Sequence, residues 1–236
     1  MGDVLYAVVP AYNEAANIEA LVEEWLPAVR ATGPRSRLVV VDDGSKDDTA
    51  AILERLRARH GEALVLLSKP NSGHGATVLH GYAYALEQGA DWVFQTDSDR
   101  QTTPDEFPPF WGARASADAL IGWRRERQDG FSRRVVTTVL RIVVRVVFRV
   151  RAPDANCPFR LVRADALGQA LSAIPPGHNL GNVLLTVRLI QQGRRVRWLP
   201  VTFRARQGGV NSINLPKIAG IGRRAVRDFW TLRRGR

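Results

Sequence analysis

Short apolar runs alternate with helix-like stretches through the first half of the chain. Each run is four or five residues long and rich in Val, Leu or Ile, the pattern of strands buried on both faces of a parallel sheet. The stretches between the runs serve as helical crossovers, so we predict an α/β fold, a mostly parallel sheet flanked by helices. The five predicted strands are Leu5–Val9, Leu38–Val41, Ala63–Leu67, Trp92–Thr96 and Ala119–Gly122.

Start signals mark the helices between these strands. Thr103 precedes Pro104 and Glu106, which predicts a helix with Thr103 as N-cap and Glu106 closing a capping box. Another helix is expected to begin near Ala76. No tandem repeat or low-complexity linker interrupts the chain, so residues 1–236 are interpreted as one domain.

Polar, turn-forming residues follow each of the first four strands. In open parallel sheets, ligands bind at the carboxyl ends of the strands. A binding site is therefore expected where these turns meet. The turns are Pro10–Glu14, Asp42–Ser45, Lys69–Gly75 and Asp97–Gln101.

Two acidic pairs stand in these turns. Asp97 and Asp99 are separated by one residue, and such carboxylates can flank a divalent cation that also holds phosphate oxygens. The alternative is a pair of solvated turn acids. An acid at Asp42 or Asp43 can bind a base imide or a ribose hydroxyl, or can simply belong to a turn before a helix capped by an aspartate.

The third turn contains a histidine between two glycines. Gly73 and Gly75 would let backbone amides approach a phosphate at the start of the next helix. His74 is interpreted as a turn residue, not a catalyst.

Charge is unevenly distributed. The net charge is +11, but residues 1–118 hold 10 Lys and Arg against 18 Asp and Glu, whereas the remainder holds 24 against 5. A basic half indicates an anionic partner such as a phosphate substrate, a lipid surface or nucleic acid. Nucleic acid is not expected, because no binding motif is present and the acidic half would repel a phosphate backbone.

No leader or membrane-spanning segment is predicted. Residues 1–6 lack a basic region followed by an apolar stretch, so the expected location is the cytoplasm. The most lipid-like run, residues 135–150, is interrupted by Arg141, Arg145 and Arg149. The single cysteine, Cys157, makes an internal disulfide impossible.

Four segments match one enzyme family in order and spacing. They are Pro10–Glu14, Val41–Ser45 with Asp48 and Thr49, Asn71–Gly81, and Gln95–Gln101. With them the chain resembles the family 2 glycosyltransferases, and within these the dolichol- or polyprenyl-phosphate sugar synthases. The resemblance implies a GT-A fold, a nucleotide-sugar donor, Mg²⁺ or Mn²⁺, a polyprenyl-phosphate acceptor and inversion at the anomeric carbon.

The resemblance also implies roles for individual residues. Looser matches occur at Gly122–Arg124, at Arg134 with Thr138, at Asp154–Leu161 and at Arg206–Ser212. Residues 1–122 would bind the donor and residues 123–236 would face acceptor and membrane. The implied donor-binding residues are Pro10, Tyr12, Glu14, Asp42, Asp43, Asp97, Ser98, Asp99 and Gln101, of which Asp97, Asp99 and Gln101 would hold the metal; the implied acceptor-phosphate residues are Arg124, Arg134, Thr138 and Arg206. Asp99 and Arg206 would also take part in catalysis.

Departures from the family pattern leave the acceptor open. Cys157–Arg160 replaces a Ser-Gly-Phe-Arg-like sequence, and the loop Arg206–Ser212 is longer than usual. A lipid phosphate needs no general base, whereas a hydroxyl acceptor does. Asp154 is the candidate base; alternatively it is a turn acid paired with Arg160. Polymerisation is not expected, because the chain lacks a Gln-x-x-Arg-Trp motif.

Two basic amphipathic helices are predicted in the second half, at about residues 131–150 and 213–232. In the first, Arg134, Arg141, Arg145 and Arg149 share one face among apolar residues. Such helices lie in the interface of an anionic bilayer, so we expect a peripheral protein at the inner face of the cell membrane. The alternative is a helix packed on the core with one solvated face.

Three other functions compete with lipid glycosylation. The first is the same donor chemistry on a soluble hydroxyl acceptor. The second is a nucleotidyltransferase-like protein, against which stands the lack of a Gly-rich, Lys-containing loop at the first strand end. The third is a membrane-associated scaffold, against which stand the intact acidic motifs. The sequence leaves the sugar, the nucleoside and the oligomeric state undetermined.

Overall fold

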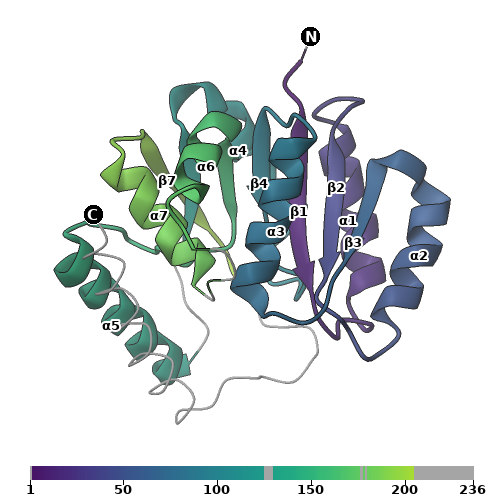
Figure 1. The fold of residues 1–236 in the computed structure, drawn as a ribbon, viewed down its shortest axis with the longest axis horizontal. Coiled ribbons are helices and arrows are strands. Elements are labelled where there is room, and N and C mark those ends of the chain that lie inside the picture. Colours follow the sequence, from purple (N-terminus) through teal and green to yellow (C-terminus); the bar gives the residue numbers. More distant parts are fainter. Residues whose placement is uncertain (1, 125–129, 176–177, 179, 205–236) are drawn as a thin grey trace.

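The computed structural model describes residues 2–124, 130–175, 178 and 180–204. Their strands form one seven-stranded sheet in the order β3-β2-β1-β4-β6-β5-β7 (Figure 1). Only β6 runs antiparallel to its neighbours β4 and β5. The strands are β1 (Leu5–Ala11), β2 (Arg37–Asp42), β3 (Leu64–Ser68), β4 (Trp92–Gln95), β5 (Ala119–Arg124), β6 (Arg160–Arg163) and β7 (Val196–Val201).

Helices cover both faces of the sheet (Figure 1). Alternation along β1 shows why: Tyr6 and Val8 pack with α3, α5, α6 and α7, whereas Leu5 and Val9 pack with α1, α2 and α4. The central strands β1, β2 and β4 therefore bury both their faces, and their sequences are largely apolar. The helices are α1 (Ile18–Arg30), α2 (Thr49–His60), α3 (His74–Glu87), α4 (Phe107–Ala113), α5 (Gly130–Phe148), α6 (Ala164–Leu171) and α7 (Gly181–Gln191).

One edge of the sheet collects the strand ends that matter for function. β1 to β5 and β7 are all parallel to one another and so end at the same edge, where β6 begins. The loop ahead of β6, residues 151–159, therefore meets the turns after β4 and β5. Because strands from both sides of residue 122 belong to this sheet, the two predicted halves share one sheet.

The predicted elements largely agree with the observed ones. All five predicted strands are confirmed with small boundary shifts, and α3 begins at His74, two residues before the expected start. The prediction of a capping box at Thr103 was wrong. Thr103 makes no side-chain cap and precedes a short 3-10 turn, Pro104–Glu106, because Glu106 Oε1 instead accepts the backbone N–H of Thr202 at 2.8 Å.

The first basic helix is present as α5, with a shorter end than predicted. Arg149 adopts a left-handed φ of 58°, so the helix ends at Phe148 and Arg149 is not part of it. Val144, Val147 and Phe148 are buried in the core. The opposite side exposes arginines and two large apolar side chains: Arg141, Ile142, Arg145 and Val146.

The core-packed interpretation of this helix is confirmed for one side, and contact with a bilayer stays a prediction. One side of α5 is packed, and the exposed side is both basic and apolar. No helix in the described ranges is long and apolar enough to cross a membrane. The second predicted helix, about residues 213–232, lies outside the described residues.

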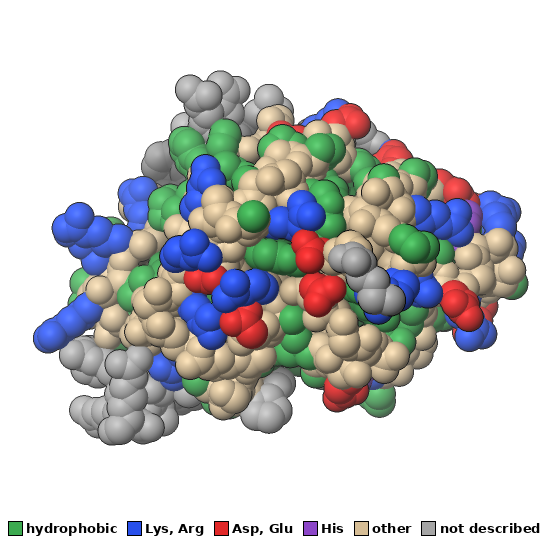
Figure 2. Space-filling view, turned by 90° about the horizontal axis from the view of Figure 1, so that it is seen from above, with side chains coloured by type: hydrophobic (Ala, Val, Ile, Leu, Met, Phe, Trp, Pro, Cys, Tyr) green, Lys and Arg blue, Asp and Glu red, His purple; other side chains and the backbone are tan. Residues whose placement is uncertain are grey.

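Ion pairs lie at the other end of the parallel strands, where these strands begin. Asp118 binds Arg163 at 2.9 Å and Arg195 at 3.5 Å, and Asp165 binds Arg163 and Arg194. Figure 2, a view from above, shows basic and acidic side chains next to one another. These arginines join the ends of β5, β6 and β7 and are balanced by carboxylates.

Candidate active site

The turns after β1 and β2 are hydrogen-bonded to each other. Asn13, which adopts a left-handed φ of 54°, donates its N–H to Ser45 Oγ at 2.9 Å and accepts the N–H of Lys46 at 2.8 Å. Ser45 Oγ in turn donates to Asp42 Oδ1 at 2.5 Å. These bonds thus hold the two strand ends together.

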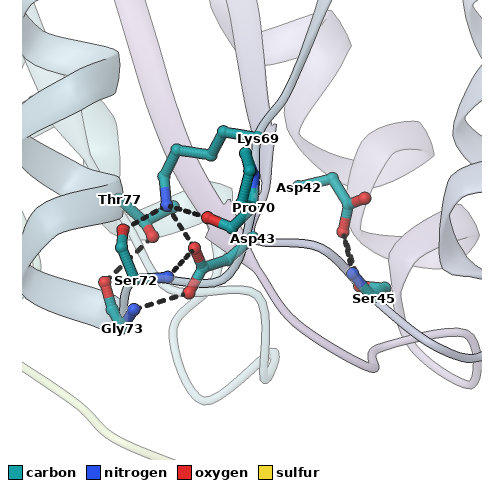
Figure 3. A network of polar contacts seen from close by, with 8 residues as sticks. All are labelled: Asp42, Asp43, Ser45, Lys69, Pro70, Ser72, Gly73 and Thr77. Atoms are coloured by element: carbon teal, nitrogen blue, oxygen red, sulfur yellow. Dashed lines mark hydrogen bonds and ion pairs between the residues drawn. The ribbon is translucent and has the colours of Figure 1, made fainter.

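Asp43 organises the turn that leads into α3 (Figure 3). Its Oδ1 accepts from Lys69 Nζ and from the Ser72 N–H at 2.9 Å. Its Oδ2 accepts the Gly73 N–H at 2.9 Å, and Gly73 has a φ of 90° that favours glycine. Burial raises the pKa of Asp43, but the bonds from Lys69 and the backbone outweigh it and leave that pKa below its usual value.

The adjacent carboxylates are therefore not equivalent. Both oxygens of Asp43 are used by its own loop. Asp42 directs Oδ1 to Ser45, and across the described ranges no residue hydrogen-bonds its Oδ2. Asp42 is thus the carboxylate of this pair with an oxygen left for a ligand.

The turn after β4 carries the second acidic pair. Asp97 Oδ1 is bonded to His74 Nε2 at 2.9 Å, and Asp99 Oδ1 accepts the Gln101 N–H at 3.2 Å. Gln101 Nε2 donates to the Arg204 carbonyl at 3.0 Å, and Arg204 N–H donates to the Gln101 carbonyl at 2.8 Å. The loop is thus joined to the chain after β7.

Arg100 fixes the same turn from its other side. It adopts a left-handed φ of 55°, and its guanidinium is paired with Glu24 of α1. A left-handed conformation is uncommon for a residue with a long side chain. The ion pair holds this conformation, which keeps Asp99 and Gln101 on either side of the bend.

These side chains fit a divalent cation. Burial raises the pKa of Asp97, but nearby His74, Arg124 and Arg160 lower it by more. The pKa is therefore below its usual value, which favours the ionised carboxylate. Hard oxygens of this kind are what Mg²⁺ and Mn²⁺ take. Within the described ranges no group of three or more His, Cys, Asp and Glu gathers that could hold a metal ion, so ligands from outside the protein would have to complete the coordination.

Arg124 and Asp154 form a bidentate pair at the end of β5. Nε lies 2.7 Å from Oδ2 and Nη2 lies 2.9 Å from Oδ1. The guanidinium also lies 4.9 Å from the ring centroid of Phe203. The sequence interpretation that paired Asp154 with Arg160 was therefore wrong.

Arg160 has a structural place of its own. It is completely buried and donates to the carbonyls of Ala155, Cys157 and Asn182. It also donates to Thr186 Oγ1 at 3.2 Å. A buried charge needs such partners, and these carbonyls belong largely to the loop that carries Asp154. Burial raises the pKa of the neighbouring Cys157 thiol to about 12, which keeps it protonated and inert.

The other predicted residues have varied positions. Pro10 is buried within β1, and Ser98 is buried in the turn after β4. Tyr12 is 41% exposed at the strand end. Buried Glu14 accepts from Asn17 Nδ2 at 2.7 Å. Thr138 is an exposed residue of α5; Arg134 belongs to the same helix, its side chain lying outside the described part, and Arg206 lies wholly outside the described residues.

Sequence reasoning missed three residues of the site. Lys69 and His74 were seen only as turn residues, and Arg160 was assigned the wrong partner. Lys69 carried a signal, because it is one of three lysines in an arginine-rich chain. His74 carried none, since its partner Asp97 lies 23 residues away. Two partners of Arg160 are likewise distant, Asn182 at 22 residues and Thr186 at 26.

Solved structures define the class of this fold. Glucosyl-3-phosphoglycerate synthase from Mycobacterium tuberculosis, solved with Mn²⁺, uridine diphosphate and glucosyl-3-phosphoglycerate, is similar with a TM-score of 0.70. The match covers 99% of this chain and 81% of that one at 19% sequence identity. The expected GT-A fold is thus confirmed.

The sequence places the chain within a family. Residues 6–169 match the model for glycosyl transferase family 2, and the chain belongs to this family. It is 27% identical to undecaprenyl-phosphate mannosyltransferase from Micrococcus luteus, over 88% of this chain and 86% of that protein. It is 28% identical to polyprenol monophosphomannose synthase from Mycolicibacterium smegmatis, over 88% and 80%.

A third relative shares only part of its length. Undecaprenyl-phosphate 4-deoxy-4-formamido-L-arabinose transferase from Pseudomonas aeruginosa is 31% identical over 72% of this chain. The matched region spans half of that protein.

Proposed function

We propose that this protein transfers a sugar from a nucleoside-diphosphate donor to the phosphate of a polyprenyl lipid at a membrane surface. The three relatives above are all named for transfer to a polyprenyl or undecaprenyl carrier. The observation that carries the proposal is the bidentate pair of Arg124 and Asp154. The positively charged guanidinium of Arg124 lies close enough to Asp97 to lower the pKa of that carboxyl.

The donor's nucleoside lies at the joined ends of β1 and β2. Asp42 Oδ2 accepts a base N–H or a ribose hydroxyl, and the exposed Tyr12 ring contacts the nucleoside. Pro10 and Glu14 line the nucleoside site. Asp43 contributes indirectly, because it holds the loop that contains Lys69 in place. Uridine and guanosine both present an N–H to such an acceptor, so this pocket takes either class.

The diphosphate lies over the turn after β4, near Ser98. Asp97 and Asp99 would hold Mg²⁺ or Mn²⁺, with the Gln101 amide oxygen as a further ligand. When bound, the cation stabilises the negative charge that develops on the leaving diphosphate. Asp97 Oδ1 is already bonded to His74, so Oδ2 is the oxygen that would bind the cation.

The acceptor is an oxygen that is already ionised. A lipid phosphate oxygen attacks the anomeric carbon, the bond from that carbon to the donor phosphate breaks, and its electron pair leaves with the nucleoside diphosphate. Attack from the opposite face inverts the anomeric configuration. Arg124 orients the acceptor phosphate, helped by Arg134, Thr138 and Arg206.

Asp154 is better suited to orient Arg124 than to remove a proton. Both its oxygens already accept bonds from that guanidinium. A hydroxyl acceptor would need this carboxylate as its base, and accepting a proton would break the pair. The geometry therefore favours a phosphate acceptor over a soluble hydroxyl acceptor.

Helix α5 provides the membrane contact. Ile142 and Val146 are 55% and 63% exposed, one turn apart, and Arg141 and Arg145 flank them on the same exposed side. Apolar side chains enter the acyl boundary while arginines bind lipid phosphates. As a peripheral protein it would lie at the inner face of the cell membrane.

A transfer assay tests the proposal. Purified protein is incubated with Mn²⁺ or Mg²⁺, polyprenyl phosphate, and a panel of UDP- and GDP-sugars, and both nucleoside diphosphate and glycolipid are measured. We expect metal-dependent glycolipid from the wild type. Asp99→Ala should lower the rate by a factor of 100 or more, on the order of 3 kcal/mol of transition-state stabilisation.

The outcomes distinguish a lipid-phosphate acceptor from a soluble hydroxyl acceptor. Asp154→Asn should retain transfer with a raised KM for the lipid phosphate, because Arg124 loses its orienting partner. Turnover on a hydroxyl acceptor that is abolished by Asp154→Asn would favour the soluble alternative. Absence of donor turnover with every sugar would contradict the proposal.

A further inference from the structure

His74 is held rigidly on the donor side of the site. It is the first residue of α3, and the two residues before it are fixed by backbone bonds to Asp43 at 2.9 Å. Thr77 closes the first helical turn, because both its N–H and its hydroxyl donate to the Gly73 carbonyl. The position of the His74 backbone is therefore set by the nucleoside end of the site.

From this fixed start, the imidazole reaches the metal end. Nε2 lies 2.9 Å from Asp97 Oδ1, across 23 residues of sequence. The His74 side chain is 52% exposed and that of Asp97 is 32% exposed, so both border open space. Within the described residues this is the only hydrogen bond to the Asp97 carboxylate, and none of them bonds Oδ2.

We infer that His74 is a positioning residue for Asp97: its imidazole holds one carboxylate oxygen so that the other binds the divalent cation. Residues that hydrogen-bond a metal ligand from outside typically change metal affinity by about 10- to 100-fold when removed. The path from Asp43 through Gly73 and His74 to Asp97 also connects the nucleoside pocket with the cation. The inference rests on the proposed function, because it assumes the cation at Asp97.

Binding of Mn²⁺ itself is the test, with no turnover needed. Free Mn²⁺ is measured by its EPR signal in titrations of the full-length protein with UDP or with GDP present. His74→Leu should weaken Mn²⁺ binding about tenfold or more. His74→Gln, whose side-chain N–H can still donate to Asp97 Oδ1, should remain within about threefold of wild type.

A second histidine on the same helix is the matched control. His80 is exposed on α3, and His80→Leu should leave Mn²⁺ affinity unchanged. Thermal unfolding of all variants shows whether the fold is retained; equal unfolding temperatures for His74→Leu and His74→Gln would assign their difference to the cation site.

Three results would overturn the inference. Wild-type Mn²⁺ affinity in His74→Leu would show that Asp97 needs no positioning. A directly coordinated nitrogen in the pulsed EPR spectrum of the wild type, lost in His74→Leu, would make His74 a ligand instead. Failure of the wild type to bind Mn²⁺ with either nucleotide would contradict the proposed function itself. This failure is distinguishable, because it is seen in the wild type alone, before any variant is compared.

Discussion

Two neighbouring aspartates show how much one residue's position decides. Successive side chains of a strand point to opposite sides, so Asp42 and Asp43 leave the end of β2 in different directions. Asp42 faces the turn of Ser45, and Asp43 faces Lys69 and the start of α3. One motif thus contains two carboxylates with different partners, and both oxygens of Asp43 are used by its own loop.

Acidification tests the role of Asp43. Because its folded-state pKa lies below the usual value, the carboxylate stabilises the fold fully above about pH 4, and this contribution is lost as pH falls through the folded pKa. Asp43→Asn should lower the free energy of unfolding at pH 7 by about 2 kcal/mol. The difference from wild type should shrink below about pH 4.

Urea unfolding at several pH values measures this difference. Asp105→Asn, at an exposed carboxylate, is the control and should change stability little at any pH. A deficit of Asp43→Asn that stays constant from pH 7 to pH 3 would show that its cause is not the charge.

At the scale of elements, the close approach of α3 to the sheet places the site. Gly81 lies where an added Cβ would be 2.4 Å from Val8 Cγ1 and 3.0 Å from Val41 Cγ2. The helix therefore lies directly on β1 and β2. This contact sets the distance from the start of α3 to the turns that hold Asp43 and Asp97.

Adding a methyl group at Gly81 should move the helix. Gly81→Ala is expected to reduce stability by about 1 to 3 kcal/mol through overpacking, and the unfolding temperature by roughly 2–4 °C per kcal/mol. Differential scanning calorimetry measures both. Gly112→Ala in α4, where nothing lies within 4 Å of the added atom, should be neutral or stabilising by up to about 1 kcal/mol; equal effects at the two sites would contradict the packing argument.

At the scale of the whole molecule, charge and exposed apolar surface combine on one helix. Where the parallel strands begin, the arginines are paired with neighbouring aspartates, which neutralise their charge. Helix α5 instead exposes Arg141 and Arg145 beside Ile142 and Val146. The two surfaces are therefore expected to behave differently toward an anionic bilayer.

Flotation with vesicles of anionic and of neutral lipid tests this difference. Ile142→Ser with Val146→Ser should weaken binding about tenfold or more, since burying each side chain contributes on the order of 1 kcal/mol. Arg141→Gln with Arg145→Gln should remove the preference for anionic lipid, at about 1 kcal/mol per arginine. Arg55→Gln with Arg59→Gln on α2 is the control; equal flotation of all variants would exclude α5 as the contact.

Local patterns were sufficient for much of this protein. The apolar runs identified five strands, because a strand buried on both faces must be apolar throughout. The polar turns after them predicted that the candidate site lies at one edge of the sheet, because parallel strands end together. The resemblance carried by these turns also indicated the family, which the comparison confirmed.

Only the tertiary structure decided how the side chains are paired. Glu106 bonds Thr202 instead of closing its own helix, Asp154 binds Arg124 instead of Arg160, and His74 reaches Asp97. Each partner comes from a distant segment. The physical reason is that apolar periodicity is a local property of the chain, whereas a buried or half-buried charge selects whichever donor the packed strands bring within hydrogen-bonding distance.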